Sequence, residues 1–464
     1  MLLLERPPTP EPEALIEEAR ARQRRRRFGL AIVLVVLAGA GVAAYLTWGH
    51  SSLPAIDRVP NGPVVNLSAF AGHGNLAFVS RSTLWVVDGR KLRRMPLVPG
   101  YFVPQEPRLS PDGKWLAYLE VSPNGVTPSQ LWLAHGDGSG AREVSMPTPE
   151  KLVGWRGDEL AVIAGPERSR VCPCSSPTTV RLVTSSGSVR TLVHVPSIYN
   201  AAWSPSGNAL AVAENGQFWA RVVTYPIDGG ASRVWLSRTA KQPLNGMNGT
   251  LVDLAGWWRN GIGIWVFGNG MVHNNDGTPL DLITEPGARP REVAQTLSSG
   301  ATDAVSAGSR GIAFVITTGD SGRNVFTGKH LVVCSPCHRV GGPETGDPSW
   351  SPDGATLAFT TAPNYRFGPW TQRRIEAWFA AHRVHLYNAS TGRVTNVPGA
   401  NGATSLTWSD DGRSLLFVRD DALWLLPSLD GRAERIAGPL YPPKNWPQYF
   451  AQVSWATQFS WASR

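Results

Sequence analysis

The sequence contains few of the residues that usually build metal, haem or nucleophilic sites. Four cysteines and nine histidines are spread over 464 residues, and the histidines do not occur at the short spacings of metal ligands. No G-x-S-x-G motif is present, which argues against a fused α/β-hydrolase domain. We therefore expect no catalytic group, no metal and no cofactor, and we expect a protein that is not an enzyme.

Charged residues are also scarce, at 17% of the chain, and they are unevenly placed. Much of the formal charge of +9 comes from the arginines between Arg20 and Arg27, so the rest of the chain is only mildly basic. This distribution does not indicate a nucleic-acid partner. A hydrophobic content of 42% is that of a protein with a sizeable core.

One hydrophobic run is long enough to cross a membrane. Residues 28–48 carry no charge, and a membrane-spanning helix needs about 20 such residues. The arginines before this run predict a cytoplasmic N-terminus, and Tyr45 and Trp48 suit the opposite interface. We predict a single-pass protein of the cell membrane. A cleaved signal peptide, with a cleavage site at positions 42–44, is the alternative.

The predicted domains follow from this transmembrane run. Residues 1–27 are expected to form a basic cytoplasmic segment and residues 28–48 the transmembrane helix. Residues 49–63, rich in Ser, Pro and Gly, are a linker. Residues 64–464 are expected to form one extracytoplasmic domain.

One short sequence motif, the repeat phrase, recurs along that domain. An aromatic residue or leucine precedes a turn like Ser-Pro-Asp-Gly, and a short apolar run follows, in "PRLSPDGKWLAYLE", "AAWSPSGNALAVAE", "PSWSPDGATLAFTT" and "LTWSDDGRSLLFVR". Proline, aspartate and glycine each favour a tight turn, and the runs are typical of β-strands. The aspartates Asp112, Asp353 and Asp411 therefore have a sufficient structural role without calcium.

Weaker copies of the phrase raise the count to about eight units, with a period of roughly 40 to 55 residues. Each unit has room for four strands, and such sheets protect their edges by packing radially around a channel. The sequence therefore predicts an all-β fold, a β-propeller of about eight four-stranded blades (seven being possible), preceded by the transmembrane helix. The final strand-like stretch, residues 448–461, is expected to pair with the first blade.

At these phrases the sequence resembles the WD40-like (PD40) repeats of the TolB-type propeller family. The resemblance covers most of the exported part. It implies the propeller fold and an extracytoplasmic location, and it does not imply one activity, because such propellers serve as adaptors, sensors and accessory domains.

The cysteines form two close pairs. Cys334, Cys337 and His338 match the CxxCH pattern of c-type haem attachment. With strands A to D counted outward from the channel, these three residues border a C–D turn, whereas Cys172 and Cys174 fall in a B–C loop. Because strand direction alternates, the two pairs lie on opposite faces and do not share one zinc ion. We predict a disulfide at each pair, with haem or an exchangeable disulfide at the first pair as the alternative.

An insertion at residues 364–389 lengthens one B–C connection. Residues 371–383 have helical composition, and we expect them either to pack on the propeller rim or to dock a partner. The partner-binding candidates are Trp370, Arg373, Arg374, Ile375, Trp378, Phe379 and Arg383.

Tryptophans recur at corresponding strand ends. Trp155, Trp203, Trp350 and Trp408 are expected to belong mainly to the core, whereas Trp257 and Trp258 are expected to be exposed aromatic contacts.

The sequence thus favours a binding, scaffold or sensor module for an envelope protein or a wall polymer, with the B–C face as the binding face. A redox protein using the CxxCH motif is one alternative. A glycan-acting hydrolase or lyase is another; it would need clustered carboxylates on the innermost strands, and the phrases "AAWSP" and "SLTWS" carry none.

Overall fold

The structure is a computed structural model. It describes residues 62–89, 91–96, 103–121, 129–165, 178–216, 218–239, 251–258, 261–267, 278–296, 305–307, 311–317, 329–334, 337–342, 344–363, 372–440, 455 and 457–463. All of them belong to the second of two compact units, Gly62–Arg464. Within these ranges, no helix has the length and apolar character needed to cross a membrane. The predicted transmembrane helix at 28–48 lies outside them.

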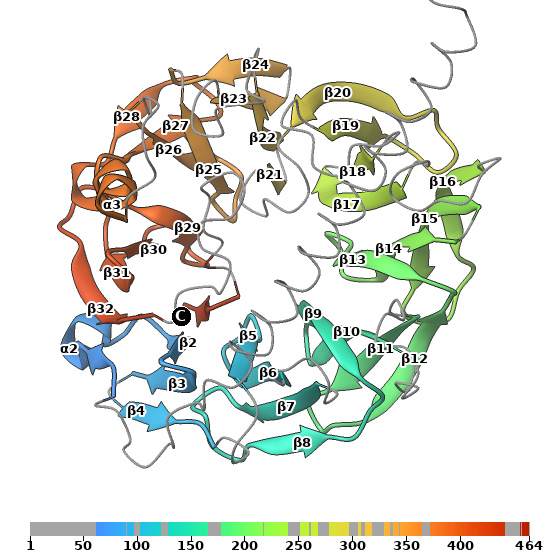
Figure 1. Cartoon of the computed structure of the whole chain (residues 1–464), viewed down its shortest axis with the longest axis horizontal. Coiled ribbons are helices and arrows are strands. Elements are labelled where there is room, and N and C mark those ends of the chain that lie inside the picture. The colour runs from blue at the N-terminus through green and yellow to red at the C-terminus, as the bar shows by residue number, and fades with distance from the viewer. Residues whose placement is uncertain are drawn as a thin grey trace, which may run out of the picture. The chain divides into compact units, whose positions relative to one another are not determined.

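The unit is an eight-bladed β-propeller of four-stranded antiparallel sheets, as predicted (Figure 1). From the centre outward, the strands of blades 1 to 4 are β33 (Phe459–Ala462), β2 (Asn75–Ser80), β3 (Thr83–Asp88), β4 (Lys91–Arg94); β5 (Val103–Leu109), β6 (Trp115–Val121), β7 (Gln130–His135), β8 (Arg142–Val144); β9 (Pro149–Arg156), β10 (Glu159–Ala164), β11 (Thr179–Thr184), β12 (Val189–His194); and β13 (Ile198–Trp203), β14 (Ala209–Asn215), β15 (Trp219–Pro226), β16 (Arg233–Thr239).

Blades 5 to 8 follow the same order. Their strands are β17 (Leu251–Trp258), β18 (Gly261–Phe267), β19 (Thr278–Ile283), β20 (Arg291–Thr296); β21 (Val305–Ala307), β22 (Ile312–Thr317), β23 (Lys329–Cys334), β24 (Cys337–Val340); β25 (Thr345–Trp350), β26 (Thr356–Thr361), β27 (Arg383–Asn388), β28 (Val394–Asn396); and β29 (Thr404–Trp408), β30 (Leu415–Arg419), β31 (Ala422–Leu426), β32 (Glu434–Gly438). A single bridge, Thr296 to Ile316, joins blades 5 and 6 into one hydrogen-bonded sheet.

Both ends of the unit take part in closing the ring. The C-terminal strand β33 is the innermost strand of blade 1, where Ala462 pairs with Asn75 of β2. The short strand β1 (Val64–Val65) extends blade 8, where Val64 pairs with Gly438 of β32. Pairing of the C-terminal stretch with the first blade is therefore confirmed.

The recurring phrase forms the A–B turn of a blade. In blade 2, the Ser110 hydroxyl donates to Asp112 Oδ1 at 2.6 Å, and Ser110 Oγ accepts from the Trp115 N–H at 2.9 Å. Gly113 takes a φ of +68°, which a residue without Cβ adopts at little cost. The same Ser–Asp bond recurs at 2.6 Å in blades 7 and 8, between Ser351 and Asp353 and between Ser409 and Asp411. These aspartates are thus structural groups of the turns.

The hydrophobic core lies between blades rather than inside any one of them. Strands β6 and β10, for example, bring Leu119 and Val162 into one buried cluster with Leu152 of β9. A single four-stranded sheet would leave such a face in water, so each blade depends on its neighbours for burial.

Tryptophan side chains add hydrogen bonds between consecutive inner strands. Each indole Nε1–H donates to the backbone carbonyl of an inner-strand residue of the preceding blade. The pairs are Trp155 to Arg108 (2.8 Å), Trp203 to Gly154 (2.9 Å), Trp257 to Ala202 (3.3 Å) and Trp408 to Ser349 (2.8 Å). Trp257 is half-buried and bonded in this way, so the expectation that it is an exposed contact is wrong.

Three short helices complete the described structure. The helix α2 (Leu67–Phe70) begins after Asn66, whose side chain accepts from the Ala69 N–H. The helix α3 (Gln372–Ala380) lies in the B–C connection of blade 7, within the predicted helical stretch. The 3-10 turn η3 (Pro398–Ala400) follows β28.

We predict that Trp408→Phe lowers the free energy of unfolding by about 1 kcal/mol more than Trp350→Phe does. The two indoles are equally buried, at 8% and 9% exposure. Trp408 donates to the neighbouring blade, whereas Trp350 Nε1 has no hydrogen-bond partner among the described residues. Urea titration of the full-length protein measures both variants. Equal losses would show that the interblade bond contributes nothing beyond packing.

Candidate functional site

The insertion helix packs on the propeller rim, which is one of the two outcomes expected for it. Trp378 is only 8% exposed, and its Nε1–H donates to the Pro363 carbonyl at 3.0 Å. Its ring packs edge-on against Phe379 and His382. Phe379 in turn packs on the buried cluster between blades 8 and 1. These two candidates therefore hold the helix on the rim.

The other candidates on the insertion divide into two groups. Arg373 and Arg383 are exposed and Arg374 is half-buried. Trp370, like the side chain of Ile375, lies outside the described structure. Among the described candidates on the insertion, the exposed side chains are therefore arginines rather than aromatic residues.

A disulfide joins Cys334 and Cys337, which face each other at the end of the β23–β24 hairpin. In this state neither sulfur is free to form the thioether bonds of c-type haem. His338 is exposed, and its Nε2 lies 2.9 Å from the Tyr387 hydroxyl of blade 7. Cys172 and Cys174 fall outside the described residues.

The inner strands do carry carboxylates, contrary to the expectation from the repeat phrases. Glu106 lies on β5, Asp253 on β17 and Asp347 on β25. Glu106 Oε2 accepts from the Leu152 N–H of the next blade at 3.0 Å, and Asp253 Oδ1 accepts from the adjacent Leu254 N–H. Among the described residues, no three metal-ligating side chains gather in one place. Glu106 and Asp253 therefore accept hydrogen bonds from the backbone of the propeller itself.

A polar cavity of about 310 Å³ lies where blades 1 and 2 meet, and we take it as the candidate site. All of its lining residues lie in turns or at strand ends on the face of the propeller that carries the A–B and C–D turns. Its lining consists of Asn75 and Asp88 from blade 1 and of Asp112, Gly113, Lys114, Trp115, His135, Gly136 and Asp137 from blade 2. The cavity is therefore on the opposite face from the B–C connection that carries α3.

The two turns of blade 2 that line the cavity are in close contact. A Cβ added to Gly136 would stand 1.8 Å from the Gly113 carbonyl oxygen, so only glycine fits there. The Gly136 N–H donates to the Lys114 carbonyl at 2.6 Å. The glycines of "SPDG" and "HGDG" therefore set the distance between the walls.

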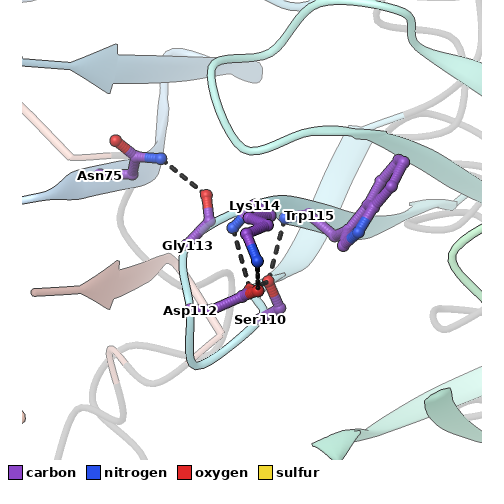
Figure 2. Close-up of polar contacts among 6 residues, drawn as sticks. All are labelled: Asn75, Ser110, Asp112, Gly113, Lys114 and Trp115. Atoms are coloured by element: carbon purple, nitrogen blue, oxygen red, sulfur yellow. Dashed lines mark hydrogen bonds and ion pairs between the residues drawn. The ribbon is translucent and has the colours of Figure 1, made fainter. Parts of the chain in front are cut away.

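Asn75 is the most unusual group of the lining. Its Nδ2–H donates to the Gly113 carbonyl at 2.7 Å, which joins blade 1 to the turn of blade 2 (Figure 2). Because a carbonyl oxygen can only accept, this bond fixes the orientation of the amide. The Oδ1 atom therefore points away from Gly113. Asn75 is 3% exposed, and its Oδ1 has no hydrogen-bond partner among the described residues.

Three aspartates and one lysine line the cavity, and two of these aspartates have lowered pKa values. Hydrogen bonding from Ser110 and contacts with Lys114, whose Nζ lies 2.9 Å from Asp112 Oδ2, lower the pKa of Asp112 from 3.8 to about 2. Burial raises the pKa of Asp137, but hydrogen bonds from Ser139 and the nearby Arg93 bring it below its usual value. His135 stacks on Trp115 with ring centroids 4.8 Å apart.

Reasoning from the sequence missed this cavity. The sequence predicts Asp112 as a turn residue and gives no specific role to His135, and it does not place either residue beside Asn75. Asn75 lies in a weak copy of the phrase, "GHGNLAFVSR", and its strand-pairing partner Ala462 is 387 positions away in the chain. The signal that could have found it is a polar residue at the start of the first blade's strand B.

Comparison with known proteins finds remotely similar structures but no related sequence. No family model and no curated protein matches the sequence. An oligogalacturonate lyase from Vibrio parahaemolyticus is similar in structure, with a TM-score of 0.44 and 11% identity over 81% of this chain and 99% of that chain. A prolyl endopeptidase has a TM-score of 0.45 and 12% identity over 77% of this chain and only 57% of that chain.

A third similar structure is the dihydro-heme d1 dehydrogenase NirN, with a TM-score of 0.46 and 13% identity over 82% of this chain and 76% of that chain. At these TM-scores and identities, the similarity carries no argument about what the present chain does. Membership of the TolB-type family stays a prediction from the repeat phrase.

We predict that Asp112 stabilises the protein only where it is ionised. Because its folded-state pKa is depressed, its contribution is present above the ordinary value of 3.8 and is lost as the pH falls toward about 2. The stability difference between wild type and Asp112→Asn should therefore shrink on acidification, as measured by urea midpoints over a pH series. Ser110→Ala should also weaken this pH dependence; an unchanged dependence would contradict the assignment of Ser110 as the main cause.

Proposed function

We propose that this chain is an exported binding module, held at the cell membrane by residues 28–48 with its N-terminus in the cytoplasm. Its partner is an envelope protein or a wall polymer. The proposal rests most directly on the polar cavity between blades 1 and 2, whose walls are turns fixed by their own side-chain hydrogen bonds. Rigid scaffolds commonly carry their binding groups on such turns.

The disulfide supports the proposed location. Disulfides persist mainly in oxidising compartments outside the cytoplasm, and the Cys334–Cys337 bridge lies at a hairpin end where Cys337 is exposed. The arginines before residue 28 and the uncharged run after them favour the same orientation.

The insertion helix is a second candidate surface on the other face. Arg373 and Arg383 are exposed there, and the aromatic residues beneath hold the helix in place. An acidic patch of an envelope protein would suit this surface. The two faces permit a bridging role, in which the cavity and the helix contact different molecules.

An exchangeable disulfide is the alternative that one observation favours, because Cys337 is exposed beside His338. We expect the protein purified without reductant to have the bare polypeptide mass and to resist thiol alkylation at Cys334 and Cys337 until it is reduced. A mass increase of the size of haem would instead favour electron transfer.

Topology and partner capture test the proposal together. Alkaline phosphatase fused after position 27 should be inactive and fused after position 63 should be active, because the enzyme needs export to fold. A photo-crosslinking residue at position 135 on the cavity rim, or at position 373 on α3, should then capture a second molecule in intact cells.

Position 394 provides the matched control. Val394 is exposed on the outer strand β28, away from the cavity lining, so a crosslinker there should capture nothing specific. If positions 135 and 373 return only this protein itself, or if the fusion at position 63 is inactive, the proposal fails.

A further inference from the structure

We propose that the Cys334–Cys337 disulfide is a redox-sensitive clip, and that its reduction by a dithiol loosens the joints that blade 6 makes with blades 5 and 7. This inference goes beyond the proposed function, because it concerns the stability of one part of the ring and involves no captured partner. It is carried by the position of the β23–β24 hairpin, whose two faces pack against different blades (Figure 1).

One face of the hairpin packs against blade 5. Cys334 is 1% exposed and belongs to the buried cluster that also contains Leu280 and Leu282 of β19. Cys337 lies directly opposite Cys334 in the strand pairing, so the bridge joins the two strands next to their turn. The bridge therefore holds β24 beside the strand that contacts blade 5.

The other face of the hairpin packs against blade 7. Val333 and Val340 lie in a buried cluster with Tyr387 of β27, and His338 Nε2 lies 2.9 Å from the Tyr387 hydroxyl. His338 follows Cys337 directly in β24, so its side chain points to the face opposite the bridge, because successive residues of a strand alternate between faces. Separation of β23 from β24 would therefore disturb contacts with both neighbouring blades.

Blade 6 brings no inner-strand tryptophan to its joint with blade 5. Trp155, Trp203 and Trp257 each donate from an inner strand to the preceding blade. In blade 6, the inner strand β21 and the turn after it, residues 305–311, contain no tryptophan in their sequence. The packing around Cys334 thus carries more of this joint, which makes the joint sensitive to the state of the bridge.

Reduction is expected to begin at Cys337, which is exposed, whereas Cys334 is buried. One thiol of the dithiol loses its proton and attacks Cys337 Sγ. The S–S bond breaks, and Cys334 Sγ leaves with the bonding electrons and takes up a proton. The second thiol then loses its proton and attacks the mixed disulfide, and Cys337 Sγ leaves and is protonated. The dithiol is thereby oxidised to a disulfide by two electrons, which reduce the bridge to two thiols.

The test is hydrogen exchange of the full-length protein, read by mass spectrometry, in a Cys172→Ser/Cys174→Ser background that leaves only this cysteine pair. Dithiothreitol is the dithiol probe, and alkylation reports the state of the bridge. We expect reduction without denaturant, followed by exchange about tenfold faster in β24, the order expected when the bridge of a four-residue loop is lost.

The neighbouring blades report on the joints themselves. Strands β19 and β27 keep their own sheet partners, so we expect a smaller increase in their exchange, about twofold. Strands β6 and β10 of blades 2 and 3 should be unchanged. The matched control is Cys337→Ser in the same background, which removes the bridge at an exposed position. It should show the fast exchange at once, and dithiothreitol should change nothing further.

Three results would overturn the inference. The bridge could be reduced only in denaturant, reduction could leave the exchange of β24, β19 or β27 unchanged, or exchange could increase equally in every blade. The last result would mean that the bridge supports the whole fold rather than the joints of one blade. Topology fusions and crosslinking in cells do not depend on this reduction, so the proposed function would stand.

Discussion

A hydrogen bond from an indole N–H to a backbone carbonyl of the neighbouring blade holds consecutive inner strands together. Trp203 donates to the carbonyl of Gly154, the residue that immediately precedes Trp155, and Trp155 donates to Arg108 in the blade before. Each bond therefore runs from a tryptophan near the end of one inner strand to the residue just before the equivalent position in the preceding blade. Because the blades bury their cores only against one another, this bond helps to set the register in which those cores meet.

Where the tryptophan link is missing, serine provides a substitute. Between blades 6 and 7 the indole of Trp350 has no hydrogen-bond partner among the described residues, and its backbone N–H instead donates to Ser306 Oγ of blade 6 at 3.1 Å. At the closure of the ring, Ser460 Oγ accepts from the Leu109 N–H in the same way. Both serines come from inner strands, so the contact between adjacent inner strands is kept while its chemistry changes. This tolerance explains how degenerate copies of the repeat can still form blades.

The blade number and the hairpins could be predicted from the sequence because their causes are local. The "SPDG" turn carries its own hydrogen bonds, and the apolar runs after it have the composition of strands. The inner-strand carboxylates could not be placed, because Glu106 and Asp347 lie where the pairing register shifts, with φ of +52° and +48°. A bulge turns the side chain out of the two-residue alternation on which a strand prediction depends. The candidate site was missed for a different reason, since the pairing of Asn75 with Ala462 depends on how the ring closes.

The position of the cavity beside that closure has a thermodynamic consequence. Asn75 pairs with the C-terminal strand through its backbone and with the Gly113 turn of blade 2 through its side chain. A Cβ on Gly74, the preceding residue, would stand 2.0 Å from the Ala462 carbonyl oxygen, so the two segments are in direct contact. Opening the ring would separate blade 1 from its own inner strand, so it would also disturb the cavity that blades 1 and 2 form together. Any ligand that contacts both blades at this face would therefore bind the closed ring better than an opened one, and by mass action it would stabilise the closed propeller.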